Sequence, residues 1–461
     1  MKRLRPRYAR ATRSLALIAM LPWIHTGCQG PPTDERPPNI IYIMADDLGY
    51  GDLGSYGQEQ IETPHLDRLA DEGLRFTDHY AGSTVCRPSR LVLWTGYHTG
   101  HTPIASNAEY VFQPEDVTVA EVLRQHGYAT GGVGKWAMGD TGNTGHPNRN
   151  GFDFWMGYLN QSDAHNYYPT HLWRNGEIVP LEGNVLSDHP DARGRVAVER
   201  VTYSHDVMTD AALDFLRAHA HEPFLLHIHW TIPHANNEGG YVTGDGMEVP
   251  DYGIYEDRPW PSIEKGHAAM ITRMDRDVGR LVALLEELNI ERHTVVFFTS
   301  DNGPHAEGGH DHAFFDSNGP LRGYKRDLYE GGIRVPMIVR WPGRIAAGST
   351  TDHPSAFWDY FPTAVALAGA AVPAGLDGIS YVPTLLGEAQ PQREYLFWMF
   401  GRGARATVAV RSGKWKAVRN GIADRVELYD LSLDLGEASD VAAANPDVVA
   451  RLTAIMEEAV R

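Results

Sequence analysis

Short, continuous runs of apolar and β-branched residues recur along the chain, and polar residues follow most of them. The runs span residues 40–44, 129–133, 224–230, 294–299 and 336–339. Continuous rather than alternating apolar runs are typical of strands that are buried on both faces of a mainly parallel sheet. The polar residues after the runs would then lie at the carboxyl ends of the strands, where open α/β sheets place their functional sites.

Amphipathic stretches with helical spacing separate these runs. They span residues 65–73, 117–126, 206–219 and 267–288. Thr63-Pro64 before the first stretch, and Gly73 and Gly127 after two of them, are typical helix boundaries. Strands that alternate with helices predict an α/β fold in which helices sandwich a large, mainly parallel sheet.

The pattern changes after about residue 375. Three short β-rich segments, at 407–411, 414–418 and 426–429, are joined by turn-forming residues, and a helix is expected from Pro446 to the C-terminus. We therefore predict a large domain over residues 39–375 and a small antiparallel α+β subdomain over residues 376–461.

The first 27 residues have the pattern of an export signal. They contain Lys and Arg but no Asp or Glu, and the apolar stretch at 15–24 is too short to span a bilayer. Cys28 follows Thr26-Gly27, which resembles the cleavage site of a bacterial lipoprotein, where this cysteine is lipidated. His25 replaces the usual aliphatic residue, so plain secretion stays open. We predict a signal peptide at 1–27, a Pro-rich tether at 28–38, and a bacterial protein that is periplasmic or anchored to the outer membrane by lipid.

Composition excludes several classes of protein. The chain has 461 residues and a formal net charge of −18, which argues against an electrostatically driven nucleic-acid binder. It has only two cysteines, which exclude a disulfide framework and a cysteine-rich zinc site. Contact with a membrane is expected only through the lipid anchor.

The second cysteine, Cys86, lies among polar residues rather than in an apolar run. Most isolated cysteines in exported proteins are small buried apolar residues. Arg87 and Arg90 are close in sequence, however, and positive side chains lower the pKa of a thiol, so we expect Cys86 to be reactive.

The string Cys86-Arg87-Pro88-Ser89-Arg90 resembles the core of the type I sulfatase signature. Other segments match motifs of this family in the family's order. They are Asp46-Asp47, Thr63-Pro64, Gly134-Lys135-Trp136, Pro233-His234, Ser300-Asp301-Asn302-Gly303, Leu321-Arg322-Gly323 and Leu428-Tyr429-Asp430. The resemblance covers nearly the whole chain after residue 38 and implies an alkaline phosphatase-like fold.

The resemblance also implies that Cys86 does not act as a cysteine. In this family a formylglycine-generating enzyme oxidises the cysteine to formylglycine, an aldehyde that hydrates to a geminal diol. One diol oxygen attacks the sulfur of the ester and the alcohol leaves. Collapse of the second hydroxyl then expels sulfate, which makes the reaction a two-step nucleophilic catalysis.

The remaining motifs supply a metal site and charged groups for such a reaction. Asp46, Asp47, Asp301 and Asn302 offer only oxygen ligands, which suit Ca²⁺ more than Mg²⁺, and the modified Cys86 completes the metal site by resemblance. A cation can mask the charge of a sulfate ester together with Arg90 and Lys135. The resemblance gives His234 and Lys325 a role at the bridging oxygen, by proton donation or charge stabilisation.

One position departs from the family pattern. Many members have a histidine two residues after the equivalent of Lys135, where this chain has Ala137. Some branches of the family lack this histidine. Another histidine, a water molecule or a metal-site carboxylate stays open as the base that releases sulfate.

The substrate is indicated less clearly. Residues 160–177 are rich in His, Asn, Tyr and Trp and are expected to form a loop over the strand ends, where such side chains suit sugar recognition. The candidates for substrate binding are His165, Asn166, His171, Trp173, His305, His310 and His312. The expected partner is a sulfated carbohydrate, with galactose or N-acetylgalactosamine sulfate as examples.

Two other functions stay open on the sequence. Related formylglycine enzymes hydrolyse phosphodiester or phosphonate esters at nearly the same metal site. A lipoprotein that binds surface glycans without catalysis is the alternative from another class, which Ala137 favours and the intact string around Cys86 disfavours.

Overall fold

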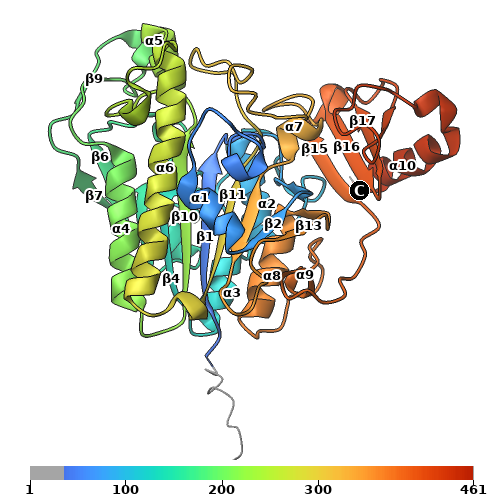
Figure 1. The fold of residues 1–461 in the computed structure, drawn as a ribbon, viewed down its shortest axis with the longest axis horizontal. Coiled ribbons are helices and arrows are strands. Elements are labelled where there is room, and N and C mark those ends of the chain that lie inside the picture. Colours follow the sequence, from blue (N-terminus) through green and yellow to red (C-terminus); the bar gives the residue numbers. More distant parts are fainter. Residues whose placement is uncertain (1–35, 460–461) are drawn as a thin grey trace, which may run out of the picture. The chain divides into compact units, whose positions relative to one another are not determined.

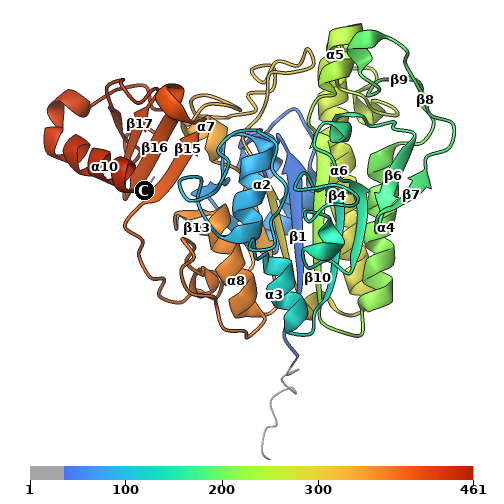
Figure 2. The ribbon, with the colours of Figure 1, turned by 180° about the vertical axis from the view of Figure 1, so that it is seen from behind.

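The computed structural model describes residues 36–459, so Cys28 and the predicted signal peptide lie outside the described residues. A ten-stranded main sheet has the order β13-β2-β12-β11-β1-β10-β4-β5-β6-β7 (Figures 1 and 2). Its strands are β1 (Asn39–Asp46), β2 (Leu74–Phe76), β4 (Ala129–Lys135), β5 (Phe154–Tyr158), β6 (His171–Arg174), β7 (Glu177–Pro180), β10 (Phe224–Pro233), β11 (Thr294–Ser300), β12 (Met337–Arg340) and β13 (Ser349–Thr351).

The central strands are parallel and buried on both faces. Strand β1 pairs in parallel with both β10 and β11, and β4 pairs in parallel with β10 and β5. Along β1, Ile40, Tyr42 and Met44 pack into one hydrophobic core, whereas Ile41 and Ile43 pack into the other. Since both sets of side chains are buried, the run is continuously apolar, as the sequence predicted.

Helices cover both faces of this sheet. One face, in front in Figure 1, carries α1 (Pro64–Asp71), α4 (Ser204–His219) and α6 (Ser262–Glu287). The opposite face, in front in Figure 2, carries α2 (Cys86–Thr95), α3 (Val119–Gln125) and α8 (Tyr360–Leu367). The predicted α/β sandwich is therefore confirmed.

The flanks of the sheet are antiparallel. Strand β12, which the sequence predicted, runs antiparallel to β11 and to β2, and β6 runs antiparallel to β5 and β7. The expected loop at 160–177 is wrong in part, because β6 occupies residues 171–174 and extends the sheet. The other short elements are β3 (His79–Tyr80) with β14 (Ser355–Ala356), β8 (Val185–Leu186) with β9 (Ala197–Glu199), α5 (Asn237–Thr243), α7 (Glu330–Ile333) and α9 (Val382–Leu385).

A second, antiparallel sheet follows near the C-terminus, as predicted. It contains β15 (Leu396–Phe400), β16 (Thr407–Ser412), β17 (Trp415–Arg419) and β18 (Glu427–Asp430), with α10 (Pro446–Glu458) packed against it (Figure 1). The sequence indicated the last three strands and the helix but not β15. Within residues 36–459, none of the helices combines the length and apolar character needed to cross a membrane.

Buried polar contacts connect this C-terminal sheet to the rest of the protein. Lys416 Nζ lies 2.8 Å from Glu330 Oε1 and 3.1 Å from Glu437 Oε1, and all three side chains are inaccessible to solvent. Trp398 Nε1 donates a hydrogen bond to the carbonyl of Ala81 at 2.9 Å. The two sheets therefore share a buried, charged boundary.

Candidate active site

The carboxyl ends of four neighbouring strands meet at one edge of the main sheet. Asp46 ends β1 and Lys135 ends β4, whereas His234 and Asp301 directly follow β10 and β11. These strands are adjacent and parallel, so residues far apart in sequence meet there. The structure thus brings together the strand-end residues that the sequence singled out.

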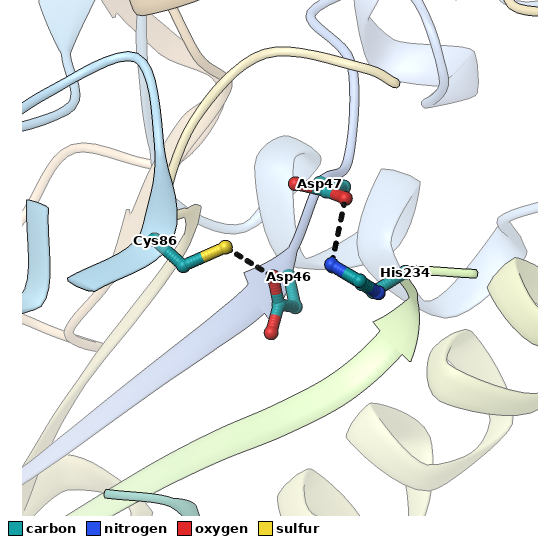
Figure 3. Close-up of side chains that lie close together, drawn as sticks. All are labelled: Asp46, Asp47, Cys86 and His234. Atoms are coloured by element: carbon teal, nitrogen blue, oxygen red, sulfur yellow. Dashed lines mark hydrogen bonds and ion pairs between the residues drawn. The ribbon is translucent and has the colours of Figure 1, made fainter. Parts of the chain in front are cut away.

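Cys86 reaches this edge from the first residue of helix α2. Its thiol donates a hydrogen bond to Asp46 Oδ1 at 3.3 Å (Figure 3). Ligand atoms of Cys86, Asp46, Asp47 and His234 all lie within 4.8 Å of one another. The N-terminal end of a helix carries partial positive charge, which favours an anion at this position.

Three buried cations neutralise the carboxylates of the site. Arg90 Nη2 lies 2.7 Å from Asp301 Oδ2 and 3.2 Å from Asp46 Oδ2. Lys135 Nζ lies 2.7 Å from Asp46 Oδ2, and Lys325 Nζ lies 2.7 Å from an oxygen of Asp47. Burial alone raises the pKa of Asp46, but Lys135 and Arg90 outweigh burial and hold the pKa well below its usual range.

His234 and Lys325 form a pair beside Asp47. Nδ1 of His234 bonds to the carbonyl of Ala235 at 2.6 Å, so this nitrogen carries the proton. Nε2 therefore accepts a hydrogen bond from Lys325 Nζ at 3.1 Å. Burial and Lys325 lower the pKa of His234 well below its usual range. Burial also lowers the pKa of Lys325, but the negative groups around it, Asp47 first among them, together outweigh burial and raise that pKa. Lys325 is thus the protonated, positively charged member of the pair.

The expected effect of the arginines on the Cys86 thiol is wrong. Burial and the neighbouring Asp46 carboxylate raise the pKa of Cys86 well above its usual range. Arg90 is engaged by Asp301 and Asp46, and Arg87 points to backbone carbonyls. The unmodified cysteine is therefore a poor nucleophile, and the reactivity of this position must come from elsewhere.

The oxygen atoms of the site fit a hard cation. Among residues 36–459, the buried Asn302 Oδ1 has no hydrogen-bond partner, while the amide of Asn302 donates to Asp47 Oδ1 at 2.7 Å. Burial, opposed by Lys325, raises the pKa of Asp47 to about 7, and burial together with Asp46 raises the pKa of Asp301. The carboxylates repel one another despite their three cations, and a divalent ion bound by Asp46, Asp47, Asp301 and Asn302 would relieve this repulsion.

A polar cavity of about 340 Å³ opens onto this site. It is lined by Arg87, Asn107, Glu109, Asn160, Gln161, Ser162, His165, Arg195, His234, Asn237, Glu307, Lys325 and Arg326. A larger cavity of about 670 Å³ lies along β13 and contains none of the strand-end residues, so we assign the chemistry to the smaller one.

Comparison with known families decides the class of protein. The model of the sulfatase family matches residues 38–370. The chain belongs to the sulfatase family. A second model, described as the C-terminal part of N-sulphoglucosamine sulphohydrolase, matches residues 311–460. The protein is therefore an enzyme of the class that hydrolyses sulfate esters.

Individual sulfatases resemble this one over almost their full length. An N-acetylgalactosamine-6-O-sulfatase of Bacteroides thetaiotaomicron is 31% identical, over 96% of this chain and 98% of the relative. Human arylsulfatase A is 34% identical, over 90% and 86% of the two chains. The crystal structure of Ps i-CgsB in complex with k-i-k-neocarrahexaose has a TM-score of 0.79 and 29% identity, covering 92% of each chain.

In this sulfatase the predicted substrate contacts divide into three groups. His165 lines the active-site cavity, stacks on His234 with ring centroids 4.8 Å apart, and pairs with Glu238 at 3.0 Å. Asn166, His171 and Trp173 instead line a separate cavity of about 160 Å³.

The third group does not line the active-site cavity. His305 bonds to the carbonyl of Pro233 at 3.1 Å, and His310 pairs with Glu264 at 2.7 Å while stacking on His267. Both are fully or almost fully buried, so their neighbours are protein groups rather than a ligand. His312 contacts Tyr324 with their rings tilted, also outside the cavity lining.

Sequence reasoning missed several residues of the cavity. Glu307 lies 3.3 Å from Lys325 Nζ and pairs with Arg326, and Arg195 pairs with Asp163 and Glu238. Glu307 follows the motif Ser300-Asp301-Asn302-Gly303 by only a few residues, and this closeness in sequence is the signal that could have identified it. Nothing in the local sequence marked Arg195.

Proposed function

We propose that this sulfatase removes sulfate from a sulfated carbohydrate, using a formylglycine made from Cys86 and a bound Ca²⁺. The observation that carries the proposal is the position of Cys86. Its sulfur lies 3.3 Å from Asp46, at the start of a helix and beside a cavity with polar walls. The raised thiol pKa supports chemical modification, because an unmodified thiol would be mostly protonated and unreactive there.

The chain's own residues have separable tasks in this proposal. Formylglycine would supply a hydrated aldehyde as nucleophile, and calcium would supply positive charge held by Asp46, Asp47, Asp301 and Asn302. Arg90 fixes two of these carboxylates through its ion pairs. Lys325 holds a proton that can be given to the departing alcohol oxygen, and the lone pair of His234 Nε2 orients its ammonium group.

A carbohydrate fits the character of the cavity. Its walls carry amide and hydroxyl groups from Asn107, Asn160, Gln161, Ser162 and Asn237, together with the imidazole of His165. Such groups exchange hydrogen bonds with sugar hydroxyls. The resemblance to an N-acetylgalactosamine-6-O-sulfatase supports galactose or N-acetylgalactosamine sulfate as the first substrates to assay.

The same proposal includes the location of the enzyme. The basic and apolar pattern before Cys28 supports export by a bacterium, and Thr26-Gly27-Cys28 supports a lipid anchor on Cys28. A surface-anchored enzyme would meet glycans outside the cytoplasm.

One preparation tests these points together. The protein is purified from its native host, and its N-terminus and the tryptic peptide over residues 76–90 are analysed by mass spectrometry. We expect lipid on Cys28 and an aldehyde at residue 86, together with faster release of sulfate from N-acetylgalactosamine 6-sulfate than of product from an aryl phosphodiester.

Cys86→Ala is the matched control for activity. We expect it to abolish turnover without lowering the unfolding temperature, because only one small side chain is lost. An unmodified thiol in the active native protein, or a faster phosphodiester reaction, would overturn the proposal. Glycan binding without any turnover would instead support the non-catalytic alternative.

A further inference from the structure

Arg87 is a nearly buried cation that has no counter-ion in the described part of the chain. Its side chain lines the active-site cavity one residue after Cys86, and only 9% of the residue is exposed. Among residues 36–459, no carboxylate lies within ion-pair distance of its guanidinium; exposed Glu109, on the same cavity, acts on it only from farther away.

Backbone carbonyls hold the guanidinium in one orientation. Nε donates to the carbonyl of Ala137 at 3.2 Å, and Nη1 donates to the carbonyls of Asn107 and Ala108 at 3.0 and 2.8 Å. The two N–H groups of Nη2 have no hydrogen-bond partner among the described residues. A fixed guanidinium with two free donors is preorganised for an oxyanion.

The other cations around the site differ in this respect. Lys325 is paired with Asp47, Arg326 with Glu307, and Arg195 with Asp163 and Glu238. Lys135 and Arg90, deeper in the site, are paired with Asp46 and Asp301. Among these cations of residues 36–459, Arg87 is therefore the one whose charge is unpaired and available to a ligand in this cavity.

An unpaired charge at this depth is costly. Burial lowers the pKa of Arg87, which reflects the loss of hydration around the guanidinium. Carbonyl dipoles recover part of this loss, but a neutral apolar or amide side chain would not incur it at all.

We propose that Arg87 binds an oxyanion of the substrate through Nη2. This inference rests on the proposed sulfatase activity and adds a specificity-determining residue to it. The oxyanion has two sources, the sulfate that is cleaved or a second sulfate or carboxylate on the same saccharide. Both present anionic oxygens that can accept charge-assisted hydrogen bonds from the N–H groups of Nη2.

The test compares Arg87→Gln and Arg87→Lys. Glutamine keeps an amide that can bond to the loop carbonyls but has no charge, whereas lysine keeps the charge. Arg124→Ala is the control for loss of one positive charge, since Arg124 lies outside the cavity. Steady-state kinetics are measured with an aryl sulfate, which has only the cleaved sulfate, and with a saccharide that carries a second anionic group, and inorganic sulfate is used as inhibitor.

We expect Arg87→Gln to raise KM by about 10- to 100-fold with little change in kcat, the size of one lost charge-assisted pair. Arg87→Lys should retain most of the affinity, and Arg124→Ala should match the wild type. An equal loss on both substrates, with weaker inhibition by sulfate, assigns Arg87 to the cleaved sulfate. A loss confined to the doubly charged saccharide assigns it to the second group.

Two results would overturn the inference. One is an Arg87→Gln variant within about twofold of the wild type on both substrates. The other is an Arg87→Lys variant as impaired as Arg87→Gln with a lowered unfolding temperature, which would show that Arg87 only braces the loop. If the wild type hydrolyses no sulfate ester, the proposed function fails, and that outcome is distinct from both.

Discussion

The carboxylate of Asp301 serves two groups at once. Its Oδ2 accepts hydrogen bonds from Arg90 Nε and Nη2 at 3.0 and 2.7 Å, and its Oδ1 accepts from the amide of Asp47 at 3.2 Å. The same side chain therefore fixes the arginine and the turn that presents the second aspartate. A change here affects both the charge and the geometry of the oxygen cluster.

We predict that Asp301→Ala lowers the affinity for Ca²⁺ by at least about tenfold. The variant loses one anionic ligand and leaves Arg90 to repel the ion. The calcium retained after dialysis can be measured by atomic emission, with Asp71→Ala, an exposed carboxylate on α1, as control. Unchanged calcium retention in Asp301→Ala would contradict the ligand set proposed here.

At the scale of residues, sequence motifs predicted the part of the site whose side chains lie at the ends of buried strands. Asp46, Lys135, His234 and Asp301 could be predicted to meet because each directly ends or follows a buried run. The state of the Cys86 thiol could not, because its pKa depends on burial and on a carboxylate 40 residues away in sequence.

At the scale of elements, α3 shows how local sequence fixes a boundary. Thr118 Oγ1 accepts from the amide of Glu121 at 3.1 Å, and Glu121 Oε2 accepts from the amide of Thr118 at 2.8 Å. This capping box satisfies two amides that the first helical turn leaves free. Thr118 also donates to the carbonyl of Asn150 at 2.9 Å, which links the start of the helix to the loop before β5.

We predict that Thr118→Ala lowers the free energy of unfolding by about 1–2 kcal/mol, because both hydroxyl contacts are lost at a buried position. Thr118→Ser keeps the hydroxyl and should lose much less. Urea unfolding followed by circular dichroism measures the difference. Equal destabilisation by both variants would show that the methyl group, not the cap, is responsible.

The elements that sequence predicted are the buried ones. Strands β1, β4, β10 and β11 and helices α4 and α6 have continuous or amphipathic patterns because their neighbours bury them. Strands β6, β7 and β13 are short and partly exposed, so their sequences resemble loops. Their pairing depends on the strands beside them, which local patterns do not reveal.

At the scale of the whole molecule, the C-terminal sheet positions the loop that carries Lys325. Before Lys325, Arg322 Nη1 donates to the hydroxyl of Tyr429 at 3.0 Å and to the carbonyl of Glu437 at 2.9 Å. After it, Glu330 pairs with Lys416 at 2.8 Å. Both ends of the loop are therefore held by residues beyond position 410.

We predict that the buried contacts between the two sheets make the free energy of unfolding depend on pH, through the carboxyl group of Glu437. Burial and the nearby Glu330, opposed by Lys416, raise the pKa of Glu437 from 4.5 to about 7. A carboxyl whose pKa is raised on folding binds its proton more tightly in the folded state, so stability is lost as pH rises from about 4.5 to 7. Each pH unit in that range costs up to about 1.4 kcal/mol.

Glu437→Gln tests this, because glutamine mimics the protonated form. The variant should gain in unfolding temperature relative to the wild type as pH rises from 5 to 7, with Glu457→Gln on the exposed side of α10 as control. A difference between variant and wild type that stays constant over this range would refute the raised pKa.

The lysine between two buried glutamates also limits how this chain can be recombined with its relatives. A homologue's C-terminal part could replace residues 396–459 only if it brought equivalents of Lys416 and Glu437 to face Glu330. A hybrid without them would leave a buried charge unmatched, and the loss would reach Lys325 through the loop that both parts share. In evolution, Lys325 and the C-terminal sheet are therefore expected to be inherited as one unit.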